Sequence, residues 1–212
     1  MIGLIMATML EAEPFISGLD LKQLETQPFR IYGKGDLVLI LSGIGKANAS
    51  IAATYFIQRF NPFCLCNLGA AGAVDSGFSL GECFHVGHII EPDRPDLRTD
   101  LPQEHIPDIL DGFSTRTLAT QDRPIREAAE REAVAARRAN LVDMEGAAFT
   151  QACRRLARPG YLFKFVSDTP DHTSSNDIIT NIALYRDAFF RFFQNEVLPR
   201  LEENSQRNQN EA

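Results

Sequence analysis

Acidic residues follow three separate apolar segments of this chain. Glu11 and Asp168 each stand just beyond an apolar run. Asp143 and Glu145 flank Met144, at the point where a third apolar run turns into a stretch of small residues. In an open α/β sheet, ligands bind outside the carboxyl ends of the strands. Acids brought there by three segments suggest one site for a neutral, hydroxyl-rich substrate.

The pair Asp143 and Glu145 suits a contact with vicinal hydroxyl groups, because an ionised carboxylate offers two acceptor oxygens. If a helix begins near Met144, one carboxylate faces the site and the other caps backbone N–H groups. We expect both residues in the substrate site, with Glu145 the better candidate for the hydroxyl contact.

Asp168 and Glu11 are the candidates for proton transfer. Asp168 follows an apolar strand, and desolvation there would raise the pKa of its carboxyl group and let it hold a proton. A general acid needs that property near neutral pH; the alternative is a cap in the turn from Asp168 to His172. Glu11 starts a helix, where the helix N-terminus stabilises a carboxylate. A capping or solvated charge is the alternative for Glu11, and Glu13 competes for its role.

Two glycine-rich segments accompany the acids. Residues 42–46, Ser-Gly-Ile-Gly-Lys, lie between a strand and a helix. Neither GxxxxGK[ST] nor GxGxxG fits them, so we interpret this segment as a tight strand-to-helix turn. Residues 67–73, Asn-Leu-Gly-Ala-Ala-Gly-Ala, are interpreted as a second turn whose small residues let the backbone approach a ligand closely. Packing alone is the alternative explanation for both.

Composition limits the class of protein. The 212 residues, 44% of them hydrophobic, suffice for one sizeable core and are few for two domains. A net charge of -7 argues against broad binding to nucleic acid or to an anionic membrane. No apolar run reaches the roughly 18 residues of a membrane span, and residues 1–7 lack the basic start of a signal peptide. We therefore expect a cytoplasmic protein.

The four cysteines and four histidines show no metal-binding spacing. Cys64 and Cys66 alternate along an apolar run, so both should lie on one face of a strand. Cys83 and Cys153 stand far away in the sequence. Reduced thiols in the core are the expected state. We predict no metal site and no cofactor.

Strand-like and helix-like segments alternate along the chain. Strands are expected at residues 2–8, 37–41, 63–68, 83–90, 115–119 and 162–166, and helices at residues 11–17, 47–60, 125–138, 145–156 and 177–201. This order predicts a single-domain, three-layer α/β fold over residues 1–203, with a central mixed, mostly parallel twisted sheet flanked by helices. Residues 204–212 are expected to be a frayed polar tail. Residues 91–111, rich in Pro and Asp, are expected to be a functional or partly mobile loop.

The last helix has a clear start signal. Residues 173–176, Thr-Ser-Ser-Asn, all suit its N-cap, and Asp177 suits its first turn. The phenylalanines at positions 189, 190, 192 and 193 wrap more than one face of this helix. Packing on the parent sheet is the better explanation for them, and contact with a second subunit is the alternative.

Five segments, in order, resemble the nucleoside phosphorylase superfamily. They are residues 2–11 (first strand and acidic turn), 42–49 (glycine turn), 67–72 (sugar-side turn), 142–147 (ribose motif) and 166–168 (catalytic-acid motif). The resemblance is closest to the nucleosidase branch, which includes methylthioadenosine/S-adenosylhomocysteine nucleosidase and futalosine hydrolase. The order and rough spacing of the motifs extend over nearly the whole chain. The nucleoside phosphorylase-like fold is therefore the expected one.

The resemblance implies hydrolysis of the N-ribosidic bond of a purine-type or modified nucleoside. Asp168 would protonate or hydrogen-bond N7 of the purine, and Ser167 would support Asp168 or the base. Glu11 would activate the attacking water. Glu145 would hold the ribose hydroxyls above Met144, and nearby carboxylates would stabilise the cation-like sugar. The further substrate contacts that the resemblance implies are Thr8, Ala70, Gly72 and Asp143.

The chain departs from the family pattern at several points. Ala70 stands where the family often has a serine that helps phosphorylases hold phosphate, and no arginine follows the first strand to grip an anion. Both absences favour water as the nucleophile. Asp143 replaces the usual glutamate of the ribose motif. The region between Ile90 and Asp143 is shorter than in typical nucleosidases, and residues 120–125 carry no aromatic side chain to clamp the base.

Two other functions remain open from the sequence. One is a phosphate-dependent phosphorylase that holds phosphate with backbone groups and the turn at Gly43. The other is a non-catalytic nucleoside-binding protein of the same fold. Glu11, Glu145 and Asp168 together argue against a pure binder, which has little need of a water-activating base. The family forms dimers or larger assemblies, so the resemblance implies a homo-oligomer, with no nucleic acid or membrane partner.

Overall fold

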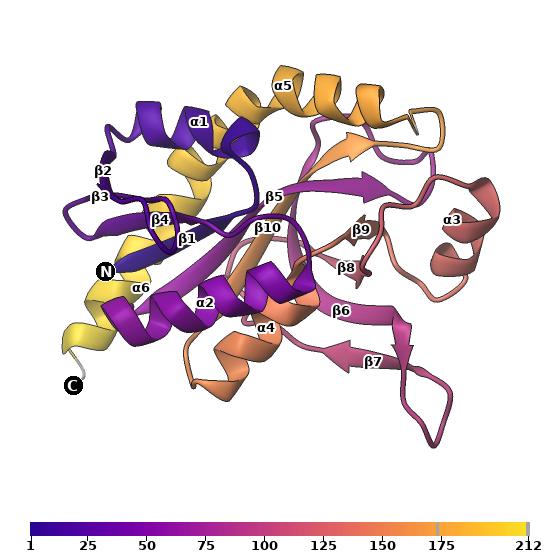
Figure 1. Cartoon of the computed structure of the whole chain (residues 1–212), viewed down its shortest axis with the longest axis horizontal. Coiled ribbons are helices and arrows are strands. Elements are labelled where there is room, and N and C mark those ends of the chain that lie inside the picture. The colour runs from indigo at the N-terminus through magenta and orange to yellow at the C-terminus, as the bar shows by residue number, and fades with distance from the viewer. Residues whose placement is uncertain (173, 211–212) are drawn as a thin grey trace.

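A ten-stranded mixed sheet lies between two groups of helices in the computed structural model, which describes residues 1–172 and 174–210 (Figure 1). The strands are β1 (Ile2–Met6), β2 (Lys22–Glu25), β3 (Ile31–Lys34), β4 (Leu37–Leu41), β5 (Cys64–Ala73), β6 (Cys83–Pro95), β7 (Pro102–His105), β8 (Thr115–Thr120), β9 (Leu141–Asp143) and β10 (Gly160–Asp168). The helices are α1 (Met9–Gly18), α2 (Lys46–Phe60), α3 (Ala128–Ala135), α4 (Gly146–Arg155), α5 (Ser175–Phe192) and α6 (Leu198–Asn210). The expected α/β fold, with a mixed central sheet flanked by helices, is confirmed.

The centre of the sheet is parallel. β1 pairs in parallel with β4 and β5, and β5 also pairs in parallel with β10. From β10 the sheet continues through β6 and β8 to β9, and β9 pairs antiparallel with β5. Strands β5, β10, β6, β8 and β9 therefore close into a ring, and β1, β4, β3 and β2 extend from it. The sequence pattern does not predict this closure, because periodicity does not say which strands pair.

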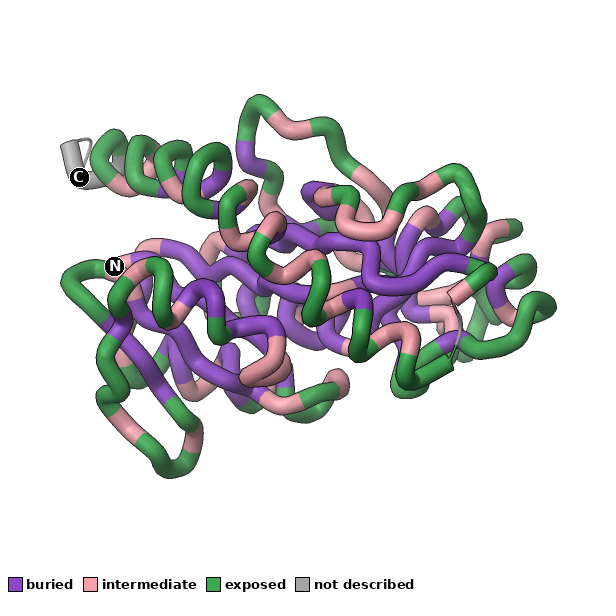
Figure 2. Tube along the Cα trace, turned by 90° about the horizontal axis from the view of Figure 1, so that it is seen from above, coloured by how far each residue is buried: buried purple, intermediate pink, exposed green. Residues whose placement is uncertain are grey.

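Helices cover both faces of the sheet. Phe56 of α2 and Phe149 of α4 pack on one face, while Phe15 of α1 and Phe189 of α5 pack on the other. Figure 2 shows the strands between them as mostly buried. A strand covered on both faces needs apolar residues at every position rather than at alternate ones. The continuous apolar run of β1, buried along its whole length, follows from this layering.

Cys64 and Cys66 lie in the same layer of the core, as expected. The phenylalanines of the last helix also pack inward. The ring centroids of Phe189 and Phe192 lie 4.9 and 6.1 Å from those of Phe165 and Phe163 in β10. Packing on the parent sheet is therefore confirmed for this part of the helix.

The region expected to be a loop, residues 91–111, is largely a hairpin. β6 continues to Pro95, and β7 returns antiparallel to it from Pro102. Ile90 pairs with Glu104 where the hairpin leaves the sheet. Because the outer part of β6 is exposed, its residues are polar and show no hydrophobic alternation. Much of the expected loop is therefore paired strand, and β2, an exposed edge strand, escaped prediction for the same reason.

Residues 67–73 do not form a turn either. They complete β5, which runs without a break to Ala73. The small residues of this strand resemble those of a turn, since glycine and alanine are depleted in ordinary strands. Their presence in a buried strand has a structural cause at the cavity described below.

The C-terminal helix starts at one of the expected caps but ends later than expected. Ser174 is the N-cap of α5 and forms a capping box with Asp177; Thr173, another expected cap, lies outside the described residues. The helix passes through a π-helical segment, Phe193–Val197, into α6. Helical structure extends to Asn210, beyond the expected end at residue 201, and residues 211–212 lie outside the described part. Within the described residues, no helix combines the length and apolarity needed to cross a membrane.

Candidate active site

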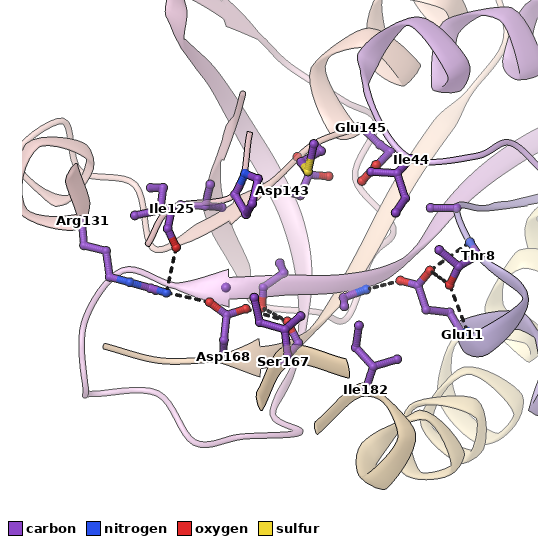
Figure 3. A pocket seen from close by; sticks show the side chains of 18 residues that line it. Thr8, Glu11, Ile44, Ile125, Arg131, Asp143, Glu145, Ser167, Asp168 and Ile182 are labelled. Atoms are coloured by element: carbon purple, nitrogen blue, oxygen red, sulfur yellow. Dashed lines mark hydrogen bonds and ion pairs between the residues drawn. The ribbon is translucent and has the colours of Figure 1, made fainter. Parts of the chain in front are cut away.

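One cavity at the end of the ring brings together all nine residues selected from the sequence (Figure 3). They are Thr8, Glu11, Ala70, Gly72, Asp143, Met144, Glu145, Ser167 and Asp168. They follow β1, line β5, end or follow β9, and end β10. Glu11 lies at one end of the cavity and Asp168 at the other. The cavity therefore has two polar ends rather than one acidic cluster.

Glu11 is fixed between α1 and β5. Thr8 caps α1, and its hydroxyl and backbone N–H both donate to Glu11 Oε2, at 2.6 and 3.1 Å. The Ala70 N–H donates to Glu11 Oε1 at 2.9 Å. The carboxylate thus caps the helix and also faces the cavity. Its competitor Glu13 is exposed and pairs with Arg186 at 2.7 Å, away from the cavity lining.

Two glycines of β5 make room for the catalytic candidates. A Cβ atom at Gly69 would stand 2.7 Å from Glu11 Oε1. A Cβ atom at Gly72 would stand 2.5 Å from Asp168 Oδ2. Both distances are too short for non-bonded atoms. The small residues of this strand therefore let two carboxylates lie against its backbone, which explains the composition that resembled a turn.

Asp143 and Glu145 divide their tasks as the sequence suggested. Asp143 accepts the Gly146 N–H at 2.9 Å and so caps the first turn of α4. It also accepts the Thr120 hydroxyl at 2.6 Å and forms an ion pair with Lys164 at 2.8 Å. Asp143 is therefore engaged by the protein itself. Lys164 was not singled out from the sequence, because a lysine within an apolar strand is ordinarily exposed.

Glu145 stands just before α4 and reaches across the cavity. Its Oε1 accepts the Gly45 N–H at 2.8 Å, which links it to the turn before α2. That turn is the tight strand-to-helix connection expected from the sequence, with Gly43 and Gly45 at φ values of 85° and 104°. An ionised carboxylate has about four lone-pair sites. Glu145 therefore keeps acceptor capacity for a ligand.

Burial raises the pKa of Glu145 to about 7, and the negative charge of Asp143 acts in the same direction. Lys164 opposes this shift. Burial disfavours the charged form of Lys164 as well, yet the charges of Asp143 and Glu145 outweigh that cost and raise its pKa. The sugar-side acids and Lys164 thus form one buried electrostatic unit.

This shift predicts a pH-dependent stability. The pKa of Glu145 rises from its ordinary value of 4.5 to about 7 on folding, so folding is favoured when the group is protonated. The contribution is full below about pH 4.5 and is lost as the pH rises through about 7. We expect Glu145→Gln to gain Tm relative to the wild type between about pH 5 and pH 8. Glu13→Gln, at an exposed position, is the control, and parallel Tm curves for wild type and Glu145→Gln would contradict the prediction.

Asp168 has two side-chain partners at the other end of the cavity. The Ser167 hydroxyl donates to Oδ1 at 2.8 Å, and Arg131 donates to Oδ2 at 2.7 Å. The expected burial of Asp168 is present, since only 6% of the residue is exposed. The sequence pattern does not single out Arg131. The carboxylate is therefore part of a buried ion pair, which an apolar strand end alone did not suggest.

Arg131 is almost fully buried although it comes from the short helix α3. Besides Asp168, its guanidinium donates to the carbonyl oxygens of Ala73 and Ile125. Its Nε has no hydrogen-bond partner among the described residues. In the sequence, Arg131 is one of several charged residues in a polar helix, and its spacing does not distinguish it. Only the packing of α3 against the end of the ring identifies it.

The remaining cavity walls are apolar. They consist of Ala7, Ile44, Ala71, Pro124, Ile125, Val142, Ile178 and Ile182. Pro124 and Ile125 belong to the stretch that carries no aromatic residue. The described residues of the lining likewise include no aromatic ring. Aliphatic walls between a carboxylate end and a carboxylate–guanidinium end suit a flat ring attached to a hydroxyl-rich group.

The family model and the relatives that this chain matches point to the same family. A family model described as the phosphorylase superfamily matches residues 2–94. The 5'-methylthioadenosine/S-adenosylhomocysteine nucleosidase of Staphylococcus carnosus is 30% identical over 159 residues, which are 63% of this chain and 68% of that protein. The segment that matches the family model contains Glu11 and β5. The alignment with the Staphylococcus carnosus protein is longer than this segment.

Solved structures agree with the fold. A mutant methylthioadenosine nucleosidase of Helicobacter pylori, with 5'-methylthioadenosine in the active site, superposes with a TM-score of 0.84. It is 16% identical and covers 95% of this chain and 98% of its own. The futalosine hydrolase of Helicobacter pylori gives a TM-score of 0.83 at 16% identity, over 95% of this chain and 97% of its own. At these identities the likeness concerns the fold.

Proposed function

Because this chain belongs to the nucleoside phosphorylase superfamily, within its nucleosidase branch, we propose that it hydrolyses the N-ribosidic bond of a purine-type nucleoside. The observation that carries the proposal is the set of three carboxylates on one cavity. Glu11, Glu145 and Asp168 are each held by at least one hydrogen bond to a fixed donor. Fixed carboxylates stabilise positive charge that develops on a sugar without having to reorganise.

Glu11 is the proposed general base. It accepts a proton from a water molecule while the water oxygen forms a bond to the anomeric carbon. Glu145 holds the ribose hydroxyls, and Met144 lies in the lining beside it as an apolar surface for the sugar. Thr8 and Ala70 keep the Glu11 carboxylate oriented. These contacts support a role in which Glu11 acts on water rather than merely capping α1.

Asp168 is the proposed general acid, after its carboxylate has taken up a proton from solvent. As the N-ribosidic bond breaks, the bond electrons go to the base, which takes a proton at N7 from Asp168. The Ser167 hydroxyl donates to the same carboxyl group and orients it. Arg131 stabilises the carboxylate that remains once the proton has left. Exchange with solvent then returns a proton to Asp168 and removes one from Glu11.

Contacts of the two glycine segments favour water over phosphate as the nucleophile. The backbone N–H groups of Ala70 and Gly45, which a phosphate could use, donate to Glu11 and Glu145. A phosphate there would stand beside an ionised carboxylate and be repelled. Among the described lining residues, the only basic side chain is Arg131, and it is paired with Asp168.

Two further properties belong to the proposal. We expect a homo-oligomer, because assemblies are usual in this superfamily, and light scattering of the purified protein tests it. A mass equal to one chain would contradict that expectation. We also expect the enzyme in the cytoplasm. All four cysteines are free, three of them buried, which suits a reducing compartment.

The deciding experiment incubates the purified protein with a panel of purine nucleosides, with and without inorganic phosphate. We expect release of free base at equal rates in both conditions, together with free ribose, measured by chromatography. Glu11→Gln keeps the shape of the side chain but removes the base, so its rate should fall roughly a hundredfold or more. Glu13→Gln is the matched control and should keep the wild-type rate.

Two results would replace the proposal with its alternatives. Base release only in the presence of phosphate, with ribose 1-phosphate as the product, would make the protein a phosphorylase. A rise in Tm with several nucleosides, without release of any base, would make it a nucleoside-binding protein.

A further inference from the structure

The base end of the cavity contains a cation that the proposed mechanism needs only as a partner of Asp168. Arg131 is 3% exposed and lines the cavity together with Pro124, Ile125 and Val142. Burying a guanidinium is costly unless its donors are used. Two of its partners are the carbonyl oxygens of Ala73 and Ile125, which fix the side chain in place. Its position at the cavity is therefore set before any ligand arrives.

The guanidinium still has an unused donor. The Nε of Arg131 is buried and has no partner among the described residues. Buried polar atoms in native proteins are nearly always hydrogen-bonded to protein, water or ligand. An arginine has five N–H donors and no acceptor. A ligand that meets this group favourably must therefore present an acceptor atom.

The short distance between Arg131 and Asp168 limits which atom of the ligand can be the acceptor for Arg131. Arg131 Nη2 lies 2.7 Å from Asp168 Oδ2. In the proposed function Asp168 faces N7 of a purine. The neighbouring group on the same edge of the base is the substituent at position 6. Among the described lining residues, the basic side chain on this side of the cavity is Arg131, which is bonded to the same carboxylate.

We propose that Arg131 is a specificity-determining residue that selects a purine with an oxo group at position 6 over one with an amino group there. This inference rests on the proposed function. An oxo group is an acceptor and suits the guanidinium, and arginine is the side chain that recognises the N7 and O6 edge of guanine in nucleic acids. An amino group would set donors against donors and leave buried N–H groups without partners. The substrate class is thus a hypoxanthine- or guanine-type nucleoside.

The test compares substrates that differ only at position 6. Inosine and adenosine form one pair, and 5'-methylthioinosine and 5'-methylthioadenosine form another, so the sugar end is matched within each pair. We expect kcat/KM of the wild-type protein to favour the 6-oxo member of each pair by roughly fivefold to a hundredfold. Equal rates, or a preference for the 6-amino member, would overturn the proposal.

Variants separate specificity from structure. Arg131→Met should reduce the preference to about threefold or less, mainly by slowing the 6-oxo substrate. Arg131→Lys keeps the charge beside Asp168 and provides a folded variant without the planar fork of donors. It should lose most of the preference while keeping more activity. Arg137→Met, at an exposed position in the turn after α3, is the control and should keep the wild-type ratio. A folded Arg131→Lys with an unchanged ratio would contradict a role in selection.

Binding of the free bases distinguishes failure of this inference from failure of the proposed function. Isothermal titration with hypoxanthine and with adenine needs no turnover. Tighter binding of hypoxanthine supports the role of Arg131 even if no nucleoside is cleaved, in which case only the proposed function fails. Equal or tighter binding of adenine overturns the inference, whatever the protein does to nucleosides.

Discussion

Asp168→Asn is expected to lower kcat by roughly a hundredfold to ten-thousandfold. An asparagine has nearly the shape of the aspartate and still accepts a hydrogen bond, but it has no proton to give to the leaving base. The Ser167 hydroxyl and Arg131 lie within hydrogen-bond distance of this side chain and keep it in place. Ligand binding should therefore survive, and calorimetry with an unreactive nucleoside measures it beside the rate.

The same change should also reduce stability, because it leaves the buried charge of Arg131 without its counter-ion. Adding Arg131→Met to Asp168→Asn removes that charge and should recover Tm without recovering kcat. This double variant is the control that separates folding from chemistry. A wild-type rate in Asp168→Asn would contradict the assignment of the general acid.

Lys164→Met is expected to give a large loss of stability. Lys164 and Asp143 form an ion pair at 2.8 Å, with side chains that are 2% and 1% exposed. Removal of one partner from a buried pair costs about 3–5 kcal/mol, because the remaining charge stays buried. For a domain of this size that is a Tm decrease of roughly 6–20 °C. Thermal unfolding followed by circular dichroism measures it.

A second substitution tests the cause of that loss. Asp143→Asn combined with Lys164→Met removes both charges and should recover much of the lost Tm. Lys22→Met is the surface control, since Lys22 is 72% exposed and solvent screens its pairing with Asp20. If Lys164→Met were as stable as Lys22→Met, the buried pair would not have the proposed weight.

The acids of the site were visible in the sequence because each one interrupts a pattern. Glu11, Glu145 and Asp168 follow apolar runs, and a run marks a strand whose carboxyl end faces a ligand crevice. The different tasks of Asp143 and Glu145 also follow from local rules. A helix that starts near Met144 needs one of the two acids to cap its N-terminus. Asp143 takes that part. Features set by neighbouring residues in the chain were therefore predictable.

Arg131 and Lys164 were not predictable in this way. Their partners lie 37 and 21 residues away in sequence, and only the packing of α3 and β10 brings the charges together. The glycines of β5 present the same difficulty. Gly69 and Gly72 look like turn residues until Glu11 and Asp168 are seen to occupy the space above them. The residue pattern along one strand contains no information about which side chains of other segments pack against that strand.

Closure of the ring affects how the enzyme folds during its synthesis on the ribosome. β10 pairs with β5 on one side and β6 on the other, and it is the last strand to be synthesised. A nascent chain that ends before Gly160 has Glu11 and Glu145 but lacks the strand that joins β5 to β6 and supplies Asp168. Pairings between residues so distant in sequence also form slowly. Activity should therefore emerge only after β10 has left the exit tunnel, so chains interrupted earlier are released without a working site.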